Sequence, residues 1–249
     1  MRYRDAKIAS VGALIAALKK QAPDGKGVWF RGQSVSNWQL IPSLARQQKH
    51  LAAEAALLKR FMQNAVPHLD RAPTTDWEWM FMMQHHRAPT RLLDWSESPL
   101  VALYFAVSED KHLRKDAAVW CLDPLALNAE AHVTNFHFAD EIPAFGVDDV
   151  LDNYLPSRVD GSPTVMSPVA IMGQRNTARM AAQLGVFTIN HRAHGPIESI
   201  GAKQHAWRWI VPAIAKKELR TELALLGFTA LTLFPELDRV ADLAKELLQ

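Results

Sequence analysis

The sequence contains a single cysteine, Cys121, and this scarcity excludes several classes of protein. A disulfide within the chain needs two cysteines, and a cysteine-based zinc site needs more than one thiolate. The surrounding AAVWCL segment is apolar, so we expect a buried thiol with nothing nearby to lower its pKa. We therefore expect no disulfide framework, no cysteine metal site and no reactive cysteine.

Long hydrophobic runs and blocks of one charge are also missing. No apolar stretch reaches the length of a transmembrane helix, and the MRYRDAKIAS start lacks the apolar centre of a secretory signal. The formal net charge is only +2, without the clustered basic block of a strong nucleic-acid binder. We therefore expect a cytoplasmic protein that does not engage a membrane, while scattered arginines could still line a modest groove.

The remaining composition is that of a globular protein with a core. Of the 249 residues, 49% are apolar and 22% are charged. We find no internal repeat, low-complexity segment or convincing linker, and we expect residues 1–249 to form one α+β domain. A central, mostly antiparallel sheet flanked by helices is its expected architecture. Prolines, aspartates and a DGSPT run predict a loop-rich insertion at about 124–166.

Hydrophobic periodicity predicts the elements of this domain. Helical spacing and turn residues predict helices over 8–20, 50–66, 74–86, 98–107, 215–227 and 236–248. Runs of β-branched and aromatic residues predict strands over 27–32, 117–123, 167–173, 185–190, 207–214 and 228–234. Ser98 can cap its helix and Pro99 fits the first turn, where a missing N–H costs nothing.

The VWFRGQ stretch, residues 28–33, is the first candidate for chemistry. Arg31 follows two aromatic residues at the end of a predicted strand, and Gly32 follows it. Arginine offers a fork of donors that suits phosphate or carboxylate, and glycine lets the backbone turn sharply and a ligand approach closely. Taken alone, the triplet is better explained by an arginine that pairs with an acid.

The QHHRAPTRLLDWS stretch, residues 84–96, is the second candidate. His85 and His86 end a predicted helix, where the helix dipole favours imidazolium. A predicted turn then carries Thr90, Arg91, Asp94 and Ser96. Asp94 could pair with Arg91 in a structural network, or these groups could hold a ligand, and the stretch alone does not decide between them.

Taken together, the motifs resemble a known family. They are FRGQ at 30–33, W-x-L-x-P-S-L-x-R at 38–46, QHH-x-x-PTRLLDWS-x-SP-x-VALYFA at 84–106, AQ-x-G-x-FT at 182–188 and LFPEL at 233–237. In this order they resemble the FRG domain family, which is named after its Phe-Arg-Gly triplet. The resemblance covers most of the chain, although residues 124–166 carry little of it.

The motif layout of this family is similar to that of ADP-ribosyltransferases of the Arg–Ser–Glu type. In those enzymes an aromatic-Arg-Gly strand holds the phosphates or ribose of NAD, and a Ser-Thr-Ser strand runs into a helix. DWSESPLVALYFA takes that second place here. The resemblance therefore implies a cleft with Arg31 on one wall and with Asp94, Trp95 and Ser96 on the other.

The sequence departs from that layout at two points. DWS replaces Ser-Thr-Ser, and the glutamate of the third motif is replaced by Gln183 in AAQLGVFTI. A glutamine can orient a ribose hydroxyl but carries no negative charge for an oxocarbenium-like centre. The carboxylate is left open among Asp94, Glu97, Glu198 and Glu236, or the site binds a nucleotide without cleaving it.

The resemblance implies a transferase that moves ADP-ribose from NAD to a protein or nucleic-acid acceptor, as a bacterial toxin or anti-phage effector. An antitoxin or another regulatory partner would suit such a protein. Its implied catalytic residues are Asp94, Gln183 and His86, and its implied nucleotide-binding residues are Arg31, Gly32, Gln33, His85, Arg91, Trp95, Ser96 and Tyr104. In this scheme Arg31 and Arg91 hold phosphates, and Trp95 or Tyr104 stacks on nicotinamide.

Two other functions stay open. A non-catalytic sensor could bind a nucleotide or nucleic acid in the same cleft, or the motifs could mainly build a fold whose function depends on a partner. A metal site at His191, His194 and His205 is not expected, because surface histidines are commoner. Of the tryptophans at 77, 79, 207 and 209, at least half are expected in the core rather than stacked on bases.

Overall fold

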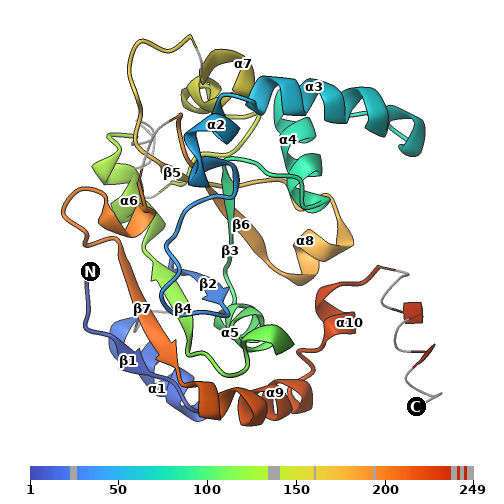
Figure 1. Cartoon of the computed structure of the whole chain (residues 1–249). Coiled ribbons are helices and arrows are strands. Elements are labelled where there is room, and N and C mark those ends of the chain that lie inside the picture. The colour runs from blue at the N-terminus through green and yellow to red at the C-terminus, as the bar shows by residue number, and fades with distance from the viewer. Residues whose placement is uncertain are drawn as a thin grey trace.

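A mixed sheet forms the centre of the fold (Figure 1). The computed structural model describes residues 1–22, 27–133, 141–159, 161–192, 195–236, 240–241 and 244–245. Within them the strands are β1 (Ala6–Lys7), β2 (Trp29–Gln33), β3 (Leu92–Ser96), β4 (Ala117–Leu122), β5 (Val169–Ile171), β6 (Gly185–Ile189) and β7 (Ala206–Val211). Their order is β1-β7-β4-β2-β3-β6-β5, and each neighbouring pair is antiparallel except β1 with β7. The expected α+β architecture is confirmed.

Helices cover the sheet and its edges. They are α1 (Val11–Gln21), α2 (Gln48–Leu51), α3 (Glu54–Ala65), α4 (Asp76–His85), α5 (Pro99–Val107), α6 (Pro124–Glu130), α7 (Pro156–Val159), α8 (Ala178–Ala182), α9 (Lys216–Leu225) and α10 (Ala230–Leu233). Helix α5 begins at its predicted cap: the Ser98 hydroxyl accepts from the Val101 N–H, and Pro99 occupies the first turn. In the described part of the chain, no helix combines the length and apolarity needed to span a bilayer.

The sheet is interrupted between β2 and β3. Each residue of β2 pairs with β4, and each residue of β3 pairs with β6. Within these described strands, however, β2 and β3 pair with each other at Phe30 and Ser96 alone. The ladder therefore consists of two halves joined at one point, and space for a cleft opens beside that point.

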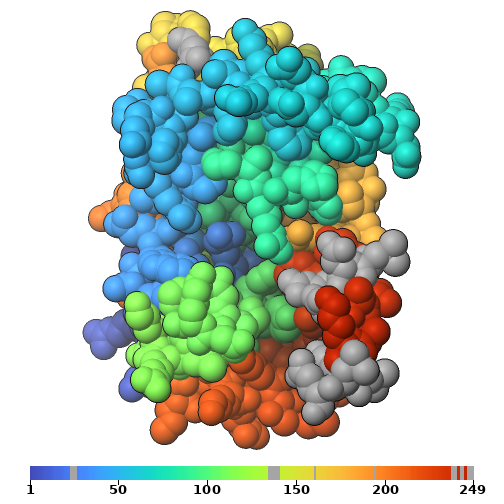
Figure 2. Space-filling model, turned by 45° about the vertical axis from the view of Figure 1, so that its right-hand side comes forward, coloured from blue at the N-terminus to red at the C-terminus, as the bar shows by residue number. Residues whose placement is uncertain are grey.

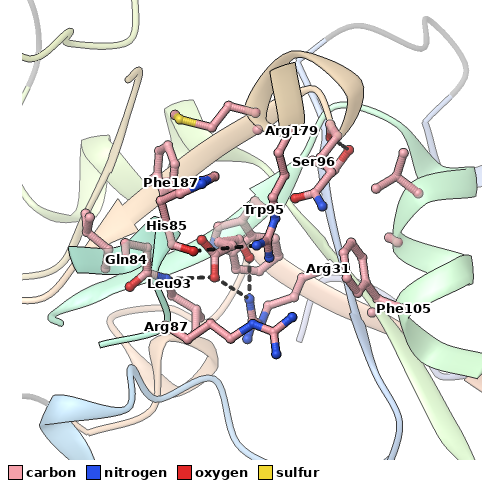
Figure 3. A pocket seen from close by; sticks show the side chains of 18 of the residues that line it. Arg31, Gln84, His85, Arg87, Leu93, Trp95, Ser96, Phe105, Arg179 and Phe187 are labelled. Carbon is pink, nitrogen blue, oxygen red and sulfur yellow. Dashed lines mark hydrogen bonds and ion pairs between the residues drawn. The ribbon is translucent and has the colours of Figure 1, made fainter. Parts of the chain in front are cut away.

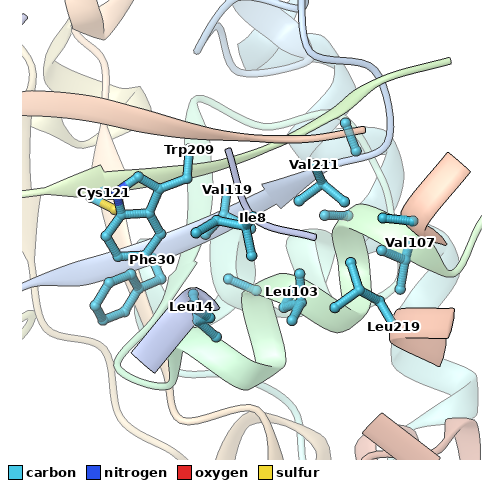
Figure 4. Packing of buried hydrophobic residues seen from close by; sticks show 14 of the residues in the cluster. Ile8, Leu14, Phe30, Leu103, Val107, Val119, Cys121, Trp209, Val211 and Leu219 are labelled. Carbon is cyan, nitrogen blue, oxygen red and sulfur yellow. The ribbon is translucent and has the colours of Figure 1, made fainter. Parts of the chain in front are cut away.

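The largest core cluster lies on the face of the sheet covered by α1, α5 and α9 (Figure 4). Strand side chains such as Val119 and Trp209 pack there against Leu103 of α5, and all three are at most 1% exposed. Cys121 is in this cluster, where burial raises the pKa of its thiol well above the ordinary value. The predicted burial of this cysteine is therefore confirmed.

Gly32 lets α5 pack directly on β2. A Cβ atom at this position would lie 1.9 Å from the Ala102 carbonyl oxygen and 2.6 Å from the Ala106 amide nitrogen, both in α5. The glycine lies inside β2 and its φ is not in the left-handed region. Its role is thus the contact between helix and strand, which corrects the expectation of a sharp turn for a ligand.

Several predicted elements need correction. Leu92–Ser96 is a strand rather than a turn, because Leu92 is buried on one face and Leu93 and Trp95 on the other. The FTALTLF segment forms α10 rather than a strand, since Thr229 and Thr232 form a capping box. The predicted loop-rich segment 124–166 contains α6 and α7 and buries Leu151 and Tyr154. Most of the helix predicted at 236–248 lies outside the described residues.

The contact between α5 and β2 can be tested by Gly32→Ala. The added methyl group meets backbone atoms that cannot rotate away, so the free energy of unfolding should fall by about 3 kcal/mol, the upper range for overpacking. Urea denaturation measures this change. Gly12→Ala is the matched control, because Gly12 is exposed in α1 and its Cβ would meet only the Ser10 hydroxyl at 3.7 Å. Equal stability of both variants would contradict this packing.

Candidate functional site

A cleft of about 350 Å³ opens beside the interruption of the sheet. On the face shown in Figure 2, the surface is hollowed between the teal α4 above and the green and red segments below. The cleft is lined by β2 and β3, by the end of α4, by α5, and by the segment from α8 into β6. This volume is within the range of small-molecule sites, about 300–1,000 Å³.

The lining combines positive charge with aromatic rings. Its arginines, among the described residues, are Arg31, Arg46, Arg87 and Arg179. Among the described residues of the lining, one is acidic, and it is Asp94. The phenylalanines Phe30, Phe81, Phe105 and Phe187 contribute apolar surface. A ligand with negative charge at one part and a flat ring at another would match this lining.

Arg31 spans the gap between the two halves of the sheet (Figure 3). Its Nη1 donates to the Asp94 carbonyl oxygen at 2.5 Å and lies 3.9 Å from Asp94 Oδ2. Burial lowers the pKa of Arg31 and the charge of Asp94 opposes that shift, so the guanidinium stays charged. The buried Arg31 Nε has no hydrogen-bond partner within the described part of the chain. Arg31 is therefore a positively charged side chain that is fixed by Asp94 and that still has an N–H donor without an acceptor.

The Asp94 carboxylate is oriented by Gln84. Gln84 Nε2 donates to Asp94 Oδ2 at 2.8 Å, and Gln84 Oε1 accepts from the Thr90 hydroxyl. The Asp94 side chain is nevertheless 57% exposed, so an incoming ligand can reach it. In the sheet register Asp94 is opposite Phe187 of β6. Asp94 thus combines a fixed orientation with access from the cleft.

Ser96 and Gln183 line the cleft but are engaged in hydrogen bonds. The Ser96 hydroxyl donates to the Gln183 carbonyl oxygen at 2.7 Å and accepts from the Ser98 N–H. Gln183 is at the C-terminal cap of α8 rather than on a strand, and its Nε2 donates to the Leu233 carbonyl oxygen at 2.9 Å. These contacts join the α8 end to β3 and to α10, so both side chains help to build the wall.

His85 and His86 lie differently. His85 lines the cleft and is half-buried, and burial lowers its pKa, with the charges of His86 and Arg179 adding to that shift. The lowered pKa of His85 favours its neutral imidazole, although the charge of Glu236 opposes the shift. His86 caps α4, is exposed, and lines a second hollow of about 400 Å³ rather than the cleft. The two hollows share Phe81, His85 and Met180.

Arg91 lies outside the cleft, which corrects the expectation that it holds a phosphate. Its side chain is fully buried, and its Nε is 2.8 Å from both carboxylate oxygens of Glu54. Its two terminal nitrogens donate to the carbonyl oxygens of Asn190 and Tyr154. All of these partners belong to the protein, so Arg91 joins α3 and the ends of β3 and β6.

Three further residues that the resemblance assigned to nucleotide binding make most of their contacts within the protein. Gln33 Oε1 accepts from Trp120 Nε1 at 2.9 Å, and its Nε2 donates to the Gln39 carbonyl. Trp95 borders the cleft, but its indole is 3% exposed and donates to the Thr188 hydroxyl at 3.0 Å, so little of the ring can meet a ligand. Tyr104 is partly buried and packs against the core, and the neighbouring Phe105 lines the cleft instead.

The other candidate carboxylates lie outside the cleft lining. Glu97 pairs with Arg175. Glu198 accepts from the Leu40 N–H at 3.2 Å, and burial raises its pKa. Glu236 is 3.7 Å from Nη1 of Arg179 and so approaches the rim. Asp94 remains the carboxylate best placed to face a ligand.

Several residues of the cleft were not predicted from the sequence. They are Gln84, Arg46, Arg87, Arg179, Phe81, Phe105 and Phe187. Four of them, Gln84, Arg46, Phe105 and Phe187, belong to the quoted motifs and could have been considered on that ground. Arg87 directly follows the cap of α4, and its φ of 62° is an unusual backbone conformation for a residue other than glycine. Arg179 had no such signal, because only the fold brings α8 beside α4.

The histidines and tryptophans that the sequence raised as weaker candidates lie in the core wherever the structure describes them. Trp77, Trp79, Trp207 and Trp209 are each at most 6% exposed, which confirms their expected place in the core. His191 and His205 are fully buried, so the expectation of surface histidines is wrong for both. His194 lies outside the described residues. Within the described ranges no three histidine, cysteine or acidic side chains come together as a metal site.

The structural position of Arg91 can be tested by Arg91→Met. Removing the guanidinium breaks the buried ion pair with Glu54 and takes the donor from the Asn190 and Tyr154 carbonyl oxygens, so the free energy of unfolding should fall by about 3–5 kcal/mol. Thermal or urea denaturation measures the loss. Arg71→Met, at an exposed position, is the control and should change stability by less than about 0.5 kcal/mol. A fully stable Arg91→Met protein would show that the Glu54 contact is dispensable.

In a comparison with known protein families, one match covers the segment that contains β2 and β3. The family model described as FRG domain matches residues 26–115, a little over a third of the chain. This range includes β2, β3, α4 and α5, and therefore Arg31, Gln84 and Asp94. Comparisons with curated proteins and with solved structures gave no match. The FRG resemblance expected from the motifs is thus confirmed as a match of the FRG domain model to residues 26–115.

Proposed function

We propose that the cleft binds NAD or a related dinucleotide and that the protein transfers ADP-ribose from NAD to a protein or nucleic-acid acceptor. One observation carries the proposal: several arginines and phenylalanines converge on a cleft that contains Asp94. Phosphates suit the arginine donors, and flat rings suit the phenylalanine surfaces. In Figure 3 the side chains of Arg31, Arg87 and Arg179 point toward the same part of the cleft.

The arrangement of strands supports the same proposal. Arg31 lies on β2, Ser96 ends β3, and β6 follows as the next strand. These neighbours are the arginine strand, the serine strand and the third strand of the similar transferase layout. The third strand carries no acid here, since β6 reads GVFTI. We therefore assign the catalytic carboxylate to Asp94, which the register places beside β6.

The reaction needs three actions from these residues. The bond between ribose C1′ and the nicotinamide nitrogen breaks, and its electron pair leaves with neutral nicotinamide. The Asp94 carboxylate stabilises the positive charge that develops at C1′. A nucleophile of the acceptor then bonds to C1′, and neutral His85 takes its proton. Arg31 and the other cleft arginines hold the phosphates throughout.

A second candidate is a non-catalytic nucleotide sensor that uses the same cleft. It is favoured by the absence of an acid from β6 and by the 57% exposure of Asp94. Exposure weakens the electrostatic effect of a carboxylate, because water screens its charge. Both candidates need the arginines, and they differ in whether bound NAD stays intact.

Incubation with labelled NAD and a cell lysate tests the transferase. Asp94→Asn keeps the size of the side chain and the main-chain carbonyl that binds Arg31, so ADP-ribose should still bind. The rate of label transfer should fall about 10²–10³-fold, the usual loss when a stabilising group is removed. Arg31→Ala should weaken ADP-ribose binding about 10–100-fold, as expected for a charge-assisted hydrogen bond.

The wild-type protein decides between the two candidates. Release of nicotinamide together with label transfer supports the transferase. Binding of NAD that stays intact supports the sensor. Equal binding of ADP-ribose by wild-type and Arg31→Ala protein would reject the cleft for both, provided that thermal melting shows the variant to be folded.

The pH dependence of binding tests the place of His85. In the empty protein its pKa lies below the ordinary value of about 6.5. A bound phosphate favours imidazolium and raises this pKa, so affinity for ADP-ribose should rise as pH falls from 7 toward about 5.5. Calorimetric titration measures the rise. His85→Gln should remove it, and a profile unchanged by His85→Gln would show that other groups, such as Glu236, cause it.

A further inference from the structure

The segment 230–236, here called the C-terminal strap, is attached to the rim of the cleft. It consists of α10 and the residues that follow, drawn in red in Figure 1. Leu233 and Phe234 are 3% and 9% exposed and pack against Val101 of α5. The Leu233 carbonyl oxygen accepts from Gln183, and the Phe234 ring contacts Phe105 edge-on at 5.8 Å. The strap thus contacts several residues that line the cleft.

Arg179 joins the cleft to the strap. Its Cζ is 4.8 Å from the centre of the Phe234 ring, and its Nη1 is 3.7 Å from Glu236 Oε1. The same Nη1 is 3.5 Å from the His85 carbonyl oxygen. Stacking on Phe234 holds the plane of the guanidinium, so its direction does not depend on Glu236 alone. Arg179 is a cation that both the cleft and the strap can use.

Glu236 and a ligand phosphate are equivalent partners for this arginine. The guanidinium fork binds either a carboxylate or a phosphate. The Glu236 side chain is 40% exposed and that of Arg179 is 20% exposed. An ion pair with this exposure is weak, so a doubly charged ligand can replace the carboxylate. The strap itself stays attached through buried Leu233 and Phe234 when the ion pair opens.

We propose that Arg179 is the second phosphate-binding arginine of the cleft and that Glu236 competes with the ligand for it. This role is the one that the sequence had suggested for Arg91. The inference rests on the proposed function only for the ligand class, a molecule that bears two linked phosphates. The Glu236 carboxylate therefore sets the ligand concentration at which the cleft fills.

Calorimetric titration of the full chain with ADP-ribose at low ionic strength tests this competition. Glu236→Gln should bind about threefold more tightly, in keeping with a weak ion pair. Glu218→Gln is the matched control, because Glu218 is exposed on α9 and the variant has the same net charge. Arg179→Met should bind about tenfold more weakly. The double variant should match Arg179→Met, since Glu236 acts through Arg179.

The outcomes separate this inference from the proposed function. Wild-type protein that binds ADP-ribose, together with equal affinity in Glu236→Gln, overturns the competition and leaves the function standing. The same variants are also titrated with inorganic pyrophosphate. Tighter pyrophosphate binding by Glu236→Gln, without binding of NAD or ADP-ribose, supports the competition and rejects the function. If folded wild-type protein binds neither ADP-ribose nor pyrophosphate, the proposed function and the competition are both rejected. If Glu218→Gln gains as much affinity as Glu236→Gln, the gain comes from net charge and the competition is rejected.

Discussion

The hydrogen bond from Arg31 to the main-chain carbonyl of Asp94 crosses the one place where the described sheet ladder is interrupted. Without it, Phe30 and Ser96 alone would hold β2 to β3 at that junction. Because this bond uses the main-chain oxygen of Asp94, the carboxylate can point outward, and Gln84 orients it there. The geometry of the cleft therefore depends on one arginine that closes a gap in the sheet and also faces whatever enters it.

The surroundings of this junction are rigid for separate physical reasons. On one side Gly32 brings the backbone of α5 against β2, so the strand carrying Arg31 is supported by direct packing. On the other side the buried pair of Arg91 and Glu54 ties the start of β3 to α3. Arg31 and Asp94 are therefore carried by two strands that are each packed against a helix. Preorganised donors bind anions better, because less conformational freedom is lost on binding.

The sequence predicted the fold class, most of the elements and the FRG segment, because hydrophobic period, caps and motif order are local signals. It did not separate the two arginines of the central motifs: Arg31 faces the cleft, whereas Arg91 is buried with Glu54, 37 positions earlier in the chain. That pairing is long-range, and no local pattern reports it. Arg179 shows the converse, since an ordinary helix residue becomes part of the cleft only when α8 docks beside α4. Trp95 was expected to stack on a ligand, but it lies on the face of β3 that packs into the core, opposite to the face of Asp94.

Arg31 is anchored by a main-chain oxygen, which every amino acid supplies. The side chain at position 94 can therefore change, by natural variation or in the laboratory, while the arginine keeps its anchor. An acid, an amide or a small residue there would alter the charge of the cleft without moving the Arg31 guanidinium. One scaffold of this kind can consequently support both catalysts and receptors.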